Sequence, residues 1–177
     1  VAVLKVLEDA VGEVDEALAR AEAGELVLIE DDYSFHGTTH TPIEPHCAVA
    51  RSSPDGLLTL WSSTQITHYV HRTLAAVLKI RVIQPCLGGA FGGKSDPFSL
   101  EFCVSLLAMR TGRPVKMLWT REEVFYAHRG RHPMNMSYRT VADSDGRVHA
   151  VDAKILIDGG AYSSFGLVTT YYAGQLL

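Results

Sequence analysis

The sequence predicts an α+β fold in which mixed sheets carry packed helices. Two segments have the composition of tight turns between antiparallel strands, Ser-Pro-Asp-Gly at 53–56 and Asp-Ser-Asp-Gly at 143–146. Each lies between short apolar or alternating runs, which are typical of strands. Helical segments occur elsewhere, but strands and helices do not alternate strictly. This irregular order favours α+β over α/β.

The first two helices are expected at residues 14–21 and 68–78. Residues 14–21 have high helix propensity, and they are followed by Gly24, a residue type that commonly ends helices. Thr67 can cap the second helix through its hydroxyl group. This second helix also carries an apolar face, formed by Val70, Leu74, Val77 and Leu78.

Two further helices are expected later in the chain. Asp96 is a natural N-cap and Pro97 suits a first helical position, so a helix is predicted from there to about Arg110. Its apolar stripe should be well buried. The stripe consists of Leu100, Cys103, Val104 and Leu107. Thr120 and Glu123 have the spacing of a capping box and predict a short helix.

Strands are expected where apolar runs are short or alternate with polar residues. The two turns define two hairpins, which pair 47–50 with 57–61 and 134–141 with 148–157. Further strands are predicted at 26–30, continuing towards Phe35, at 81–84 and at 114–119. The apolar tail at 165–177 is rich in Tyr and Thr, and its structure stays unassigned.

A glycine-rich loop at residues 88–94, Gly-Gly-Ala-Phe-Gly-Gly-Lys, lies between an expected strand and an expected helix. Glycine permits backbone angles and close approaches that side chains forbid, so the peptide groups of this loop could touch a ligand while Phe91 is held over it. A tight turn without a ligand explains the loop equally well. Lys94 could serve a phosphate, although the spacing is not that of a P-loop.

Composition argues against several classes of protein. The 177 residues carry a net charge of −4, which favours neither nucleic acid nor an acidic membrane surface as a partner. No apolar run approaches the roughly 18 residues of a membrane span. The three cysteines form no Cys-x-x-Cys pair. This argues against a disulfide framework, a thiolate zinc site or an iron–sulfur cluster, and favours a cytoplasmic location.

Several histidines offer alternative sites. Glu44 and His46 could form an acid–base pair, because the proline between them holds both in an extended dipeptide. His36, His40 and His46 could instead hold zinc or iron through their imidazoles. The basic cluster at 128–132 could contact a phosphate-bearing cofactor or a coenzyme A thioester, while a solvated loop is the simpler interpretation.

Five segments carry a resemblance to a known family. They are Glu-Pro-His-Cys-Ala at 44–48, Ser-Thr-Gln at 63–65, the glycine-rich loop at 88–94, Gly-Arg-His-Pro at 130–133 and Asp-Gly-Gly-Ala-Tyr at 158–162. In this order and at these spacings they resemble the large, molybdenum-binding subunit of the xanthine dehydrogenase and aldehyde oxidase family. The resemblance runs from about Asp31 to the end of the chain.

The resemblance implies that two parts of this chain approach a molybdenum centre. Gln65 corresponds to the family's glutamine whose side-chain amide approaches an oxo ligand of the metal, a role that suits a neutral donor. Phe91 and Gly92, with Gly89 before them, correspond to a loop whose aromatic residue walls the substrate and whose backbone lies near the metal centre. Ala90 stands where the family usually has a further glycine.

The resemblance also bears on the substrate. Phe91 and Ser95 are the implied substrate-binding residues. Purine-hydroxylating members carry a glutamate where this chain has Ser95, so a xanthine-like substrate is disfavoured. Residues 39–46 resemble the branch that reductively dehydroxylates hydroxybenzoyl coenzyme A thioesters, and His46 is implied to be buried and structural. The family usually inserts a few residues at 78–81, and this chain lacks them.

As a member of that family, residues 1–177 would form part of a molybdenum-cofactor-binding domain. The implied cofactor is molybdopterin with molybdenum, in its cytosine dinucleotide form, and the implied reaction hydroxylates an aromatic heterocycle or an aldehyde. Electrons would leave through iron–sulfur and FAD groups on partner chains or domains. The family's general-base glutamate is expected outside these residues, and none of them is expected to ligate the metal directly.

The sequence starts at Val1 without an initiator methionine and stops without a charged tail, so we expect a fragment truncated at both ends and inactive by itself. Two alternatives stay open. The first is a non-catalytic α+β binding or assembly module, in which the glycine-rich loop is only a turn. The second is a histidine-ligated metal hydrolase, which predicts bound zinc that is lost on His40→Ala.

Overall fold

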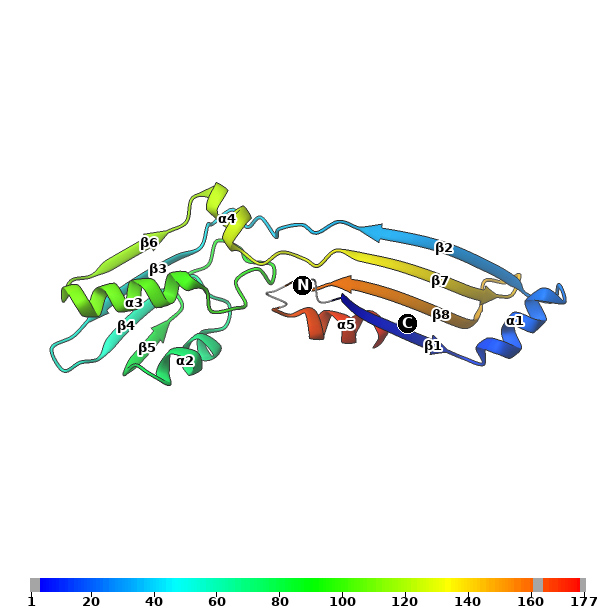
Figure 1. The fold of residues 1–177 in the computed structure, drawn as a ribbon, viewed down its shortest axis with the longest axis horizontal. Coiled ribbons are helices and arrows are strands. Elements are labelled where there is room, and N and C mark those ends of the chain that lie inside the picture. Colours follow the sequence, from blue (N-terminus) through cyan, green and yellow to red (C-terminus); the bar gives the residue numbers. More distant parts are fainter. Residues whose placement is uncertain (1–3, 161–163, 176–177) are drawn as a thin grey trace. The chain divides into compact units, whose positions relative to one another are not determined.

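The computed structural model describes residues 4–160 and 164–175 (Figure 1). The chain divides into two compact units, each treated separately below. The first unit joins residues 1–38 to residues 131–177, and the second comprises residues 39–130. The described part of the chain has no helix of sufficient length and apolar character to cross a bilayer.

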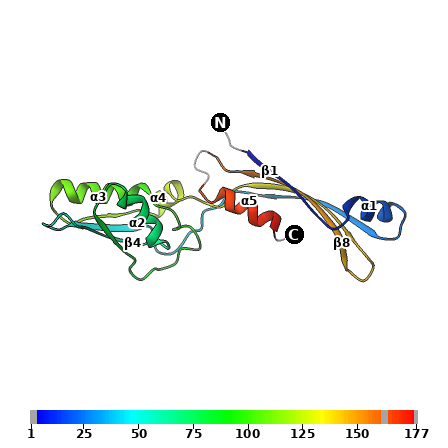
Figure 2. The same ribbon diagram turned by 90° about the horizontal axis from the view of Figure 1, so that it is seen from below.

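The first unit contains one antiparallel sheet of four strands in the order β1-β8-β7-β2. These strands are β1 (Leu4–Val11), β2 (Val27–Phe35), β7 (Met134–Ala142) and β8 (Val148–Asp158). The predicted hairpin between β7 and β8 is confirmed, whereas β1 was not predicted. Helix α1 (Val14–Glu22) packs on β8, and α5 (Gly166–Gln175) lies against β1 and β8 (Figure 2).

The second unit contains a mixed sheet of four strands in the order β5-β4-β3-β6. These strands are β3 (Cys47–Ser52), β4 (Leu58–Ser62), β5 (Ile80–Ile83) and β6 (Val115–Leu118). The predicted β3–β4 hairpin is confirmed. Helix α2 (Thr67–Ala75) connects β4 to β5, and this crossover makes the two strands parallel. The predicted α+β class with mixed sheets and packed helices is therefore confirmed.

Helix α3 (Ser99–Thr111) covers the sheet of the second unit and packs on β3, β4 and β6 (Figure 1). The core beneath it is apolar and includes Ala50, Leu60, Leu74, Leu100, Val104, Ala108 and Trp119. The predicted stripe was half wrong, because Cys103 and Leu107 are exposed. Leu100, Val104 and Ala108 recur every four residues, and this spacing keeps them on the buried side.

The start of α3 also differs from the prediction. Asp96 is not the N-cap; the helix begins three residues later, after Phe98, whose backbone is extended. The Phe98 N–H donates to Glu101 Oε2 at 3.0 Å, so a side chain from the first turn satisfies this backbone donor. Asp96 instead forms an ion pair with Arg129, with Oδ2 and Nη1 2.7 Å apart.

Of the caps predicted for two other helices, one is confirmed and one is wrong. In α4 (Arg121–Ala127) the capping box is confirmed: Thr120 Oγ1 accepts the Glu123 N–H at 3.1 Å, and Glu123 Oε2 accepts the Thr120 N–H at 2.7 Å. In α2 the N-cap position is occupied by Ile66 and not by Thr67, and no side chain caps the helix.

Candidate functional site

The glycine-rich loop leaves the region of β5 and folds around an exposed aromatic residue. Ala90 O accepts the Gly93 N–H at 2.9 Å, which closes a turn around Phe91 and Gly92. Both central residues have positive φ, 55° at Phe91 and 88° at Gly92. A left-handed phenylalanine costs on the order of 1 kcal/mol, and such strain is concentrated at functional sites. The turn holds the Phe91 side chain 68% exposed instead of packing it in the core.

Glu44 joins the two ends of this loop. Its Oε2 atom lies 2.6 Å from Lys94 Nζ and accepts the Gly88 N–H at 3.1 Å. The backbone N–H of Glu44 also donates to Gly88 O at 3.3 Å. Partial burial raises the pKa of the Glu44 carboxyl, but the hydrogen bonds from Lys94 and Gly88 outweigh burial, and the pKa lies below its ordinary value.

This arrangement overturns two of the sequence interpretations. The Lys94 side chain has no exposed area and is paired with Glu44, so it does not face solvent as a phosphate ligand would. Glu44 and His46 do not form an acid–base pair, because each is bonded to a different partner. His46 is bonded to Glu101 and Glu44 to Lys94.

Gln65 lies just beyond β4 and is exposed, and its backbone and side chain both contact the end of the loop. Its Oε1 atom accepts the Lys94 N–H at 3.3 Å and the Ser95 hydroxyl at 3.1 Å, while its own N–H donates to Lys94 O at 2.9 Å. A backbone N–H can only donate, so the amide atom that faces it must be the oxygen. The amide nitrogen Nε2 is therefore left without a hydrogen-bond partner among the described residues.

The structure thus brings together Gln65, Ser95 and the loop that contains Gly89, Phe91 and Gly92. Ser95 is bonded to Gln65, and this contact makes Ser95 a support for the amide. A hollow of about 470 Å³ is lined by Gln65 and the N-terminal part of α2. Its lining consists of Gln65, Ile66, Thr67, His68, Tyr69 and Arg72, so Phe91 does not belong to it.

The individual glycines of the loop have different neighbours. A Cβ at Gly88 would lie 2.8 Å from Glu44 Cβ, and a Cβ at Gly93 would lie 2.9 Å from His40 Nδ1. Both positions therefore exclude a side chain. At Gly92 the nearest atom is His40 Nε2 at 3.7 Å, which is ordinary contact. Gly88 and Gly93 allow close packing beneath the loop, while the side of Gly92 where a Cβ would lie is more open.

A buried polar centre lies in the core of the same unit. Glu101 Oε1 is 2.7 Å from His46 Nε2 and accepts the Ser62 hydroxyl at 2.7 Å. His46 and Glu101 both have no exposed area. The prediction that His46 is buried is confirmed, although its Nδ1 atom has no hydrogen-bond partner among the residues that the structure describes. Glu101 was not predicted from the sequence, where its signal is a carboxylate on the buried face of an apolar helix.

His128 does not belong to a solvated loop. It is only 6% exposed, and its ring stacks on Phe98 with centroids 5.0 Å apart. Burial, together with the nearby His46, His40 and Lys94, lowers the pKa of His128 to about 4, so its ring is neutral at pH 7. Arg129 is paired with Asp96. The basic cluster therefore offers no open phosphate site at these two residues.

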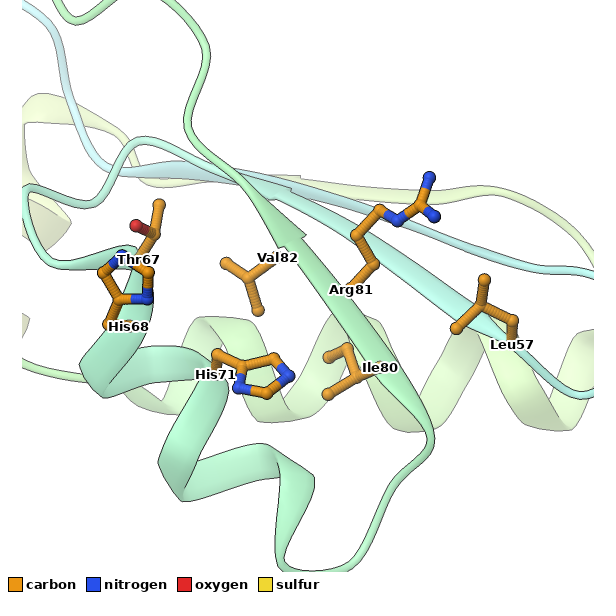
Figure 3. Close-up of a pocket in the computed structure, with 7 residues that line it drawn as sticks. All are labelled: Leu57, Thr67, His68, His71, Ile80, Arg81 and Val82. Carbon is orange, nitrogen blue, oxygen red and sulfur yellow. The ribbon is translucent and has the colours of Figure 1, made fainter.

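The remaining histidine hypothesis, a metal site, is not supported by the described residues. Within residues 4–160 and 164–175, no group of three His, Cys, Asp or Glu side chains is placed to hold a metal ion, so the site proposed for His36, His40 and His46 is wrong. Figure 3 shows a second hollow, of about 460 Å³, between α2 and β5. In it His71 faces Ile80 while Arg81 points away from the histidine, so the basic groups do not converge.

The segment at 158–162 is described only in part. Asp158 Oδ1 accepts the Gly160 N–H at 3.0 Å, and Gly160 has a φ of 56°. This is a local turn at the end of β8. Ala161 and Tyr162 lie outside the described residues.

Comparison with known proteins identifies the family. The model of the molybdopterin cofactor-binding domain matches residues 3–177. The nicotinate dehydrogenase large molybdopterin subunit of Eubacterium barkeri is 41% identical over 160 residues, which cover 88% of this chain and 36% of that protein. The xanthine dehydrogenase molybdenum-binding subunit of Escherichia coli is 34% identical over 146 residues, or 76% of this chain and 19% of that protein.

Among solved structures, the aldehyde oxidoreductase of Desulfovibrio gigas has a similar fold. It superimposes with a TM-score of 0.68 at 28% identity, over 81% of this chain and 16% of that one. The chain thus spans little more than a third, or less, of the proteins it matches. Because the family model covers almost every residue, this chain belongs to the molybdopterin cofactor-binding domain family.

Proposed function

We propose that the protein carrying this chain is a molybdenum hydroxylase, and that residues 1–177 supply part of its cofactor-binding domain. Its substrate would be an aromatic heterocycle or an aldehyde, with a coenzyme A thioester as a further candidate. Two of the relatives support this choice, since their names refer to nicotinate and aldehyde. Ser95, which is bonded to Gln65, offers no carboxylate to a purine.

The observation that carries the proposal is the orientation of the Gln65 amide. Two donors hold Oε1, and Nε2 remains available as a neutral donor on Gln65, which is exposed just beyond β4. Such a neutral donor could hydrogen-bond a polar atom at the metal centre of the cofactor without adding a charge there. The loop, which is hydrogen-bonded to Gln65 through Lys94, would bound the cofactor and the substrate with its peptide groups at Gly89 and Gly92 and with the exposed ring of Phe91.

When bound, molybdopterin with its molybdenum supplies the redox chemistry. This chain's residues would bind and orient: Gln65 through its amide nitrogen, and the loop through backbone groups held in place before the cofactor arrives. We further propose the cytosine dinucleotide form of the cofactor, iron–sulfur and FAD partners, a cytoplasmic location, and a general base outside these residues. The 177 residues alone would then be inactive.

The test is Gln65→Ala in the full-length subunit with its partners and cofactor. We expect the variant to fold and to retain molybdenum, while kcat falls by about 10²-fold, the usual effect of removing one aligned donor. Gln84→Ala, which removes an exposed amide at the end of β5, is the matched control. Unchanged turnover in Gln65→Ala would favour the alternative in which these residues form a non-catalytic module of the subunit.

A further inference from the structure

We propose that the ion pair of Glu44 and Lys94 positions the Gln65 amide and the glycine-rich loop relative to each other. The inference rests on the proposed function, because it concerns the residues that would face the cofactor. Glu44 and Lys94 would not touch the cofactor or the substrate themselves. They are positioning residues that act through Gln65 and through the backbone of the loop.

Lys94 reaches the two parts of the site through different groups. Its backbone N–H donates to Gln65 Oε1, and its carbonyl oxygen accepts the Gln65 N–H at 2.9 Å and the Thr64 hydroxyl at 3.3 Å. Its side chain is fully buried and ends 2.6 Å from Glu44 Oε2. A shift of the Lys94 backbone would therefore move the groups that orient the Gln65 amide.

Glu44 holds the other end of the loop with the same oxygen. Oε2 accepts the Gly88 N–H at 3.1 Å, and the Glu44 N–H returns a bond to Gly88 O at 3.3 Å. Gly88 and Lys94 are the first and last residues of the loop, so one carboxylate oxygen fixes its span. Arg121 supports this arrangement, since its Nη2 atom donates to Ile43 O, next to Glu44, at 2.8 Å.

Lys94 is buried more deeply than Glu44, and this difference predicts that the two single variants differ in severity. The Lys94 side chain is 0% exposed, whereas that of Glu44 is 32% exposed. Glu44→Gln would leave a buried ammonium group without its counter-ion, which is costly. Lys94→Met would leave a carboxylate that water can reach. Removing both charges would leave neither problem, so the second change should partly repair the first.

The test places Glu44→Gln, Lys94→Met and the double variant in the full-length subunit with its partners and cofactor. Hydrogen exchange of the peptide covering 86–95 reports loop order, and kcat and KM report the site. We expect Glu44→Gln to speed exchange and to lower kcat by about tenfold each, with KM changed less than about threefold, because misplacement mainly affects the reacting geometry. Adding Lys94→Met should recover part of both losses.

Two exposed residues of the same unit provide matched controls, Glu122→Gln on α4 and Lys116→Met on β6. Each control removes the same kind of charge from a residue outside the ion pair, so exchange of the peptide 86–95 and kcat should stay unchanged. Normal exchange at 86–95 in Glu44→Gln would overturn the proposal, as would a double variant worse than Glu44→Gln. If Glu44→Gln does not fold, Lys94→Met alone must still speed exchange of the loop, and a normal rate there overturns the proposal equally.

The measurements separate this inference from the function on which it rests. Loop exchange reports the positioning pair without reference to turnover, while the kcat of Gln65→Ala reports the proposed function. Faster exchange in Glu44→Gln together with normal turnover in Gln65→Ala would refute the proposed role of Gln65 and keep the ordering of the loop by the ion pair. Normal exchange in Glu44→Gln together with reduced turnover in Gln65→Ala would keep the proposed role of Gln65 and refute the positioning pair.

Discussion

The buried carboxylate of Glu101 should be among the most sensitive positions in the second unit. Glu101→Leu replaces it with an apolar group of similar size and removes the acceptor of three bonds, from His46 Nε2 at 2.7 Å, the Ser62 hydroxyl at 2.7 Å and the Phe98 N–H at 3.0 Å. A buried polar group left without a partner costs about 1–3 kcal/mol. Because the effects overlap, we expect a total loss of about 3–6 kcal/mol in the free energy of unfolding.

Glu101→Gln tests the reasoning behind this magnitude. The amide oxygen can still accept the Phe98 N–H, while the amide NH₂ can face Ser62 and His46, since a hydroxyl accepts as well as donates and a neutral imidazole can switch tautomer. All three neighbours then keep a partner. We therefore expect this variant to lose only about 1–2 kcal/mol, the net value of stronger bonds to a charged acceptor.

The assay is urea unfolding of the purified protein that carries this chain, followed by circular dichroism. Glu122→Gln, an exposed glutamate on α4, should stay within about 0.5 kcal/mol of the parent, as surface substitutions usually do. A loss below about 1 kcal/mol in Glu101→Leu would refute the unsatisfied-donor argument. Equal losses in the Leu and Gln variants would show that the charge, and not the acceptor geometry, is what matters.

Two further predictions concern residues beneath the loop. Gly93→Ala should lower the free energy of unfolding by about 1–3 kcal/mol, because the new Cβ would lie 2.9 Å from His40 Nδ1, and a thermal melt that matches the parent would contradict this clash. His128 has a folded-state pKa of about 4, below the 6.5 of an unfolded histidine, so unfolded chains bind more protons between these values. Its contribution to stability should be complete above about pH 6.5 and fall by up to about 1.4 kcal/mol per pH unit towards pH 4. His128→Phe should remove this slope in urea unfolding measured at several pH values, and an unchanged slope would contradict the assignment.

Local signals in the sequence predicted most elements of the fold correctly. Turn composition located the hairpins at 53–56 and 143–146, and the capping box located the start of α4. Strand β1 was missed, because its Leu-Lys-Val-Leu-Glu-Asp-Ala-Val sequence lacks strict alternation and is paired by contacts with β8, which is remote in sequence. Asp96 was misplaced as an N-cap because Arg129, more than thirty residues later, competes for its carboxylate.

The same distinction applies to the candidate site. The sequence by itself determined the family and the stretch of residues to inspect, because glycines and a lone aromatic residue constrain the backbone locally wherever they occur. Only the tertiary structure decided that Lys94 is a buried partner of Glu44, that Ser95 holds Gln65, and that His46 and Glu44 are bonded to different residues. Those outcomes depend on burial and on hydrogen bonds between residues that lie 30 to 55 positions apart in the sequence. Local periodicity encodes neither the burial of these side chains nor their partners.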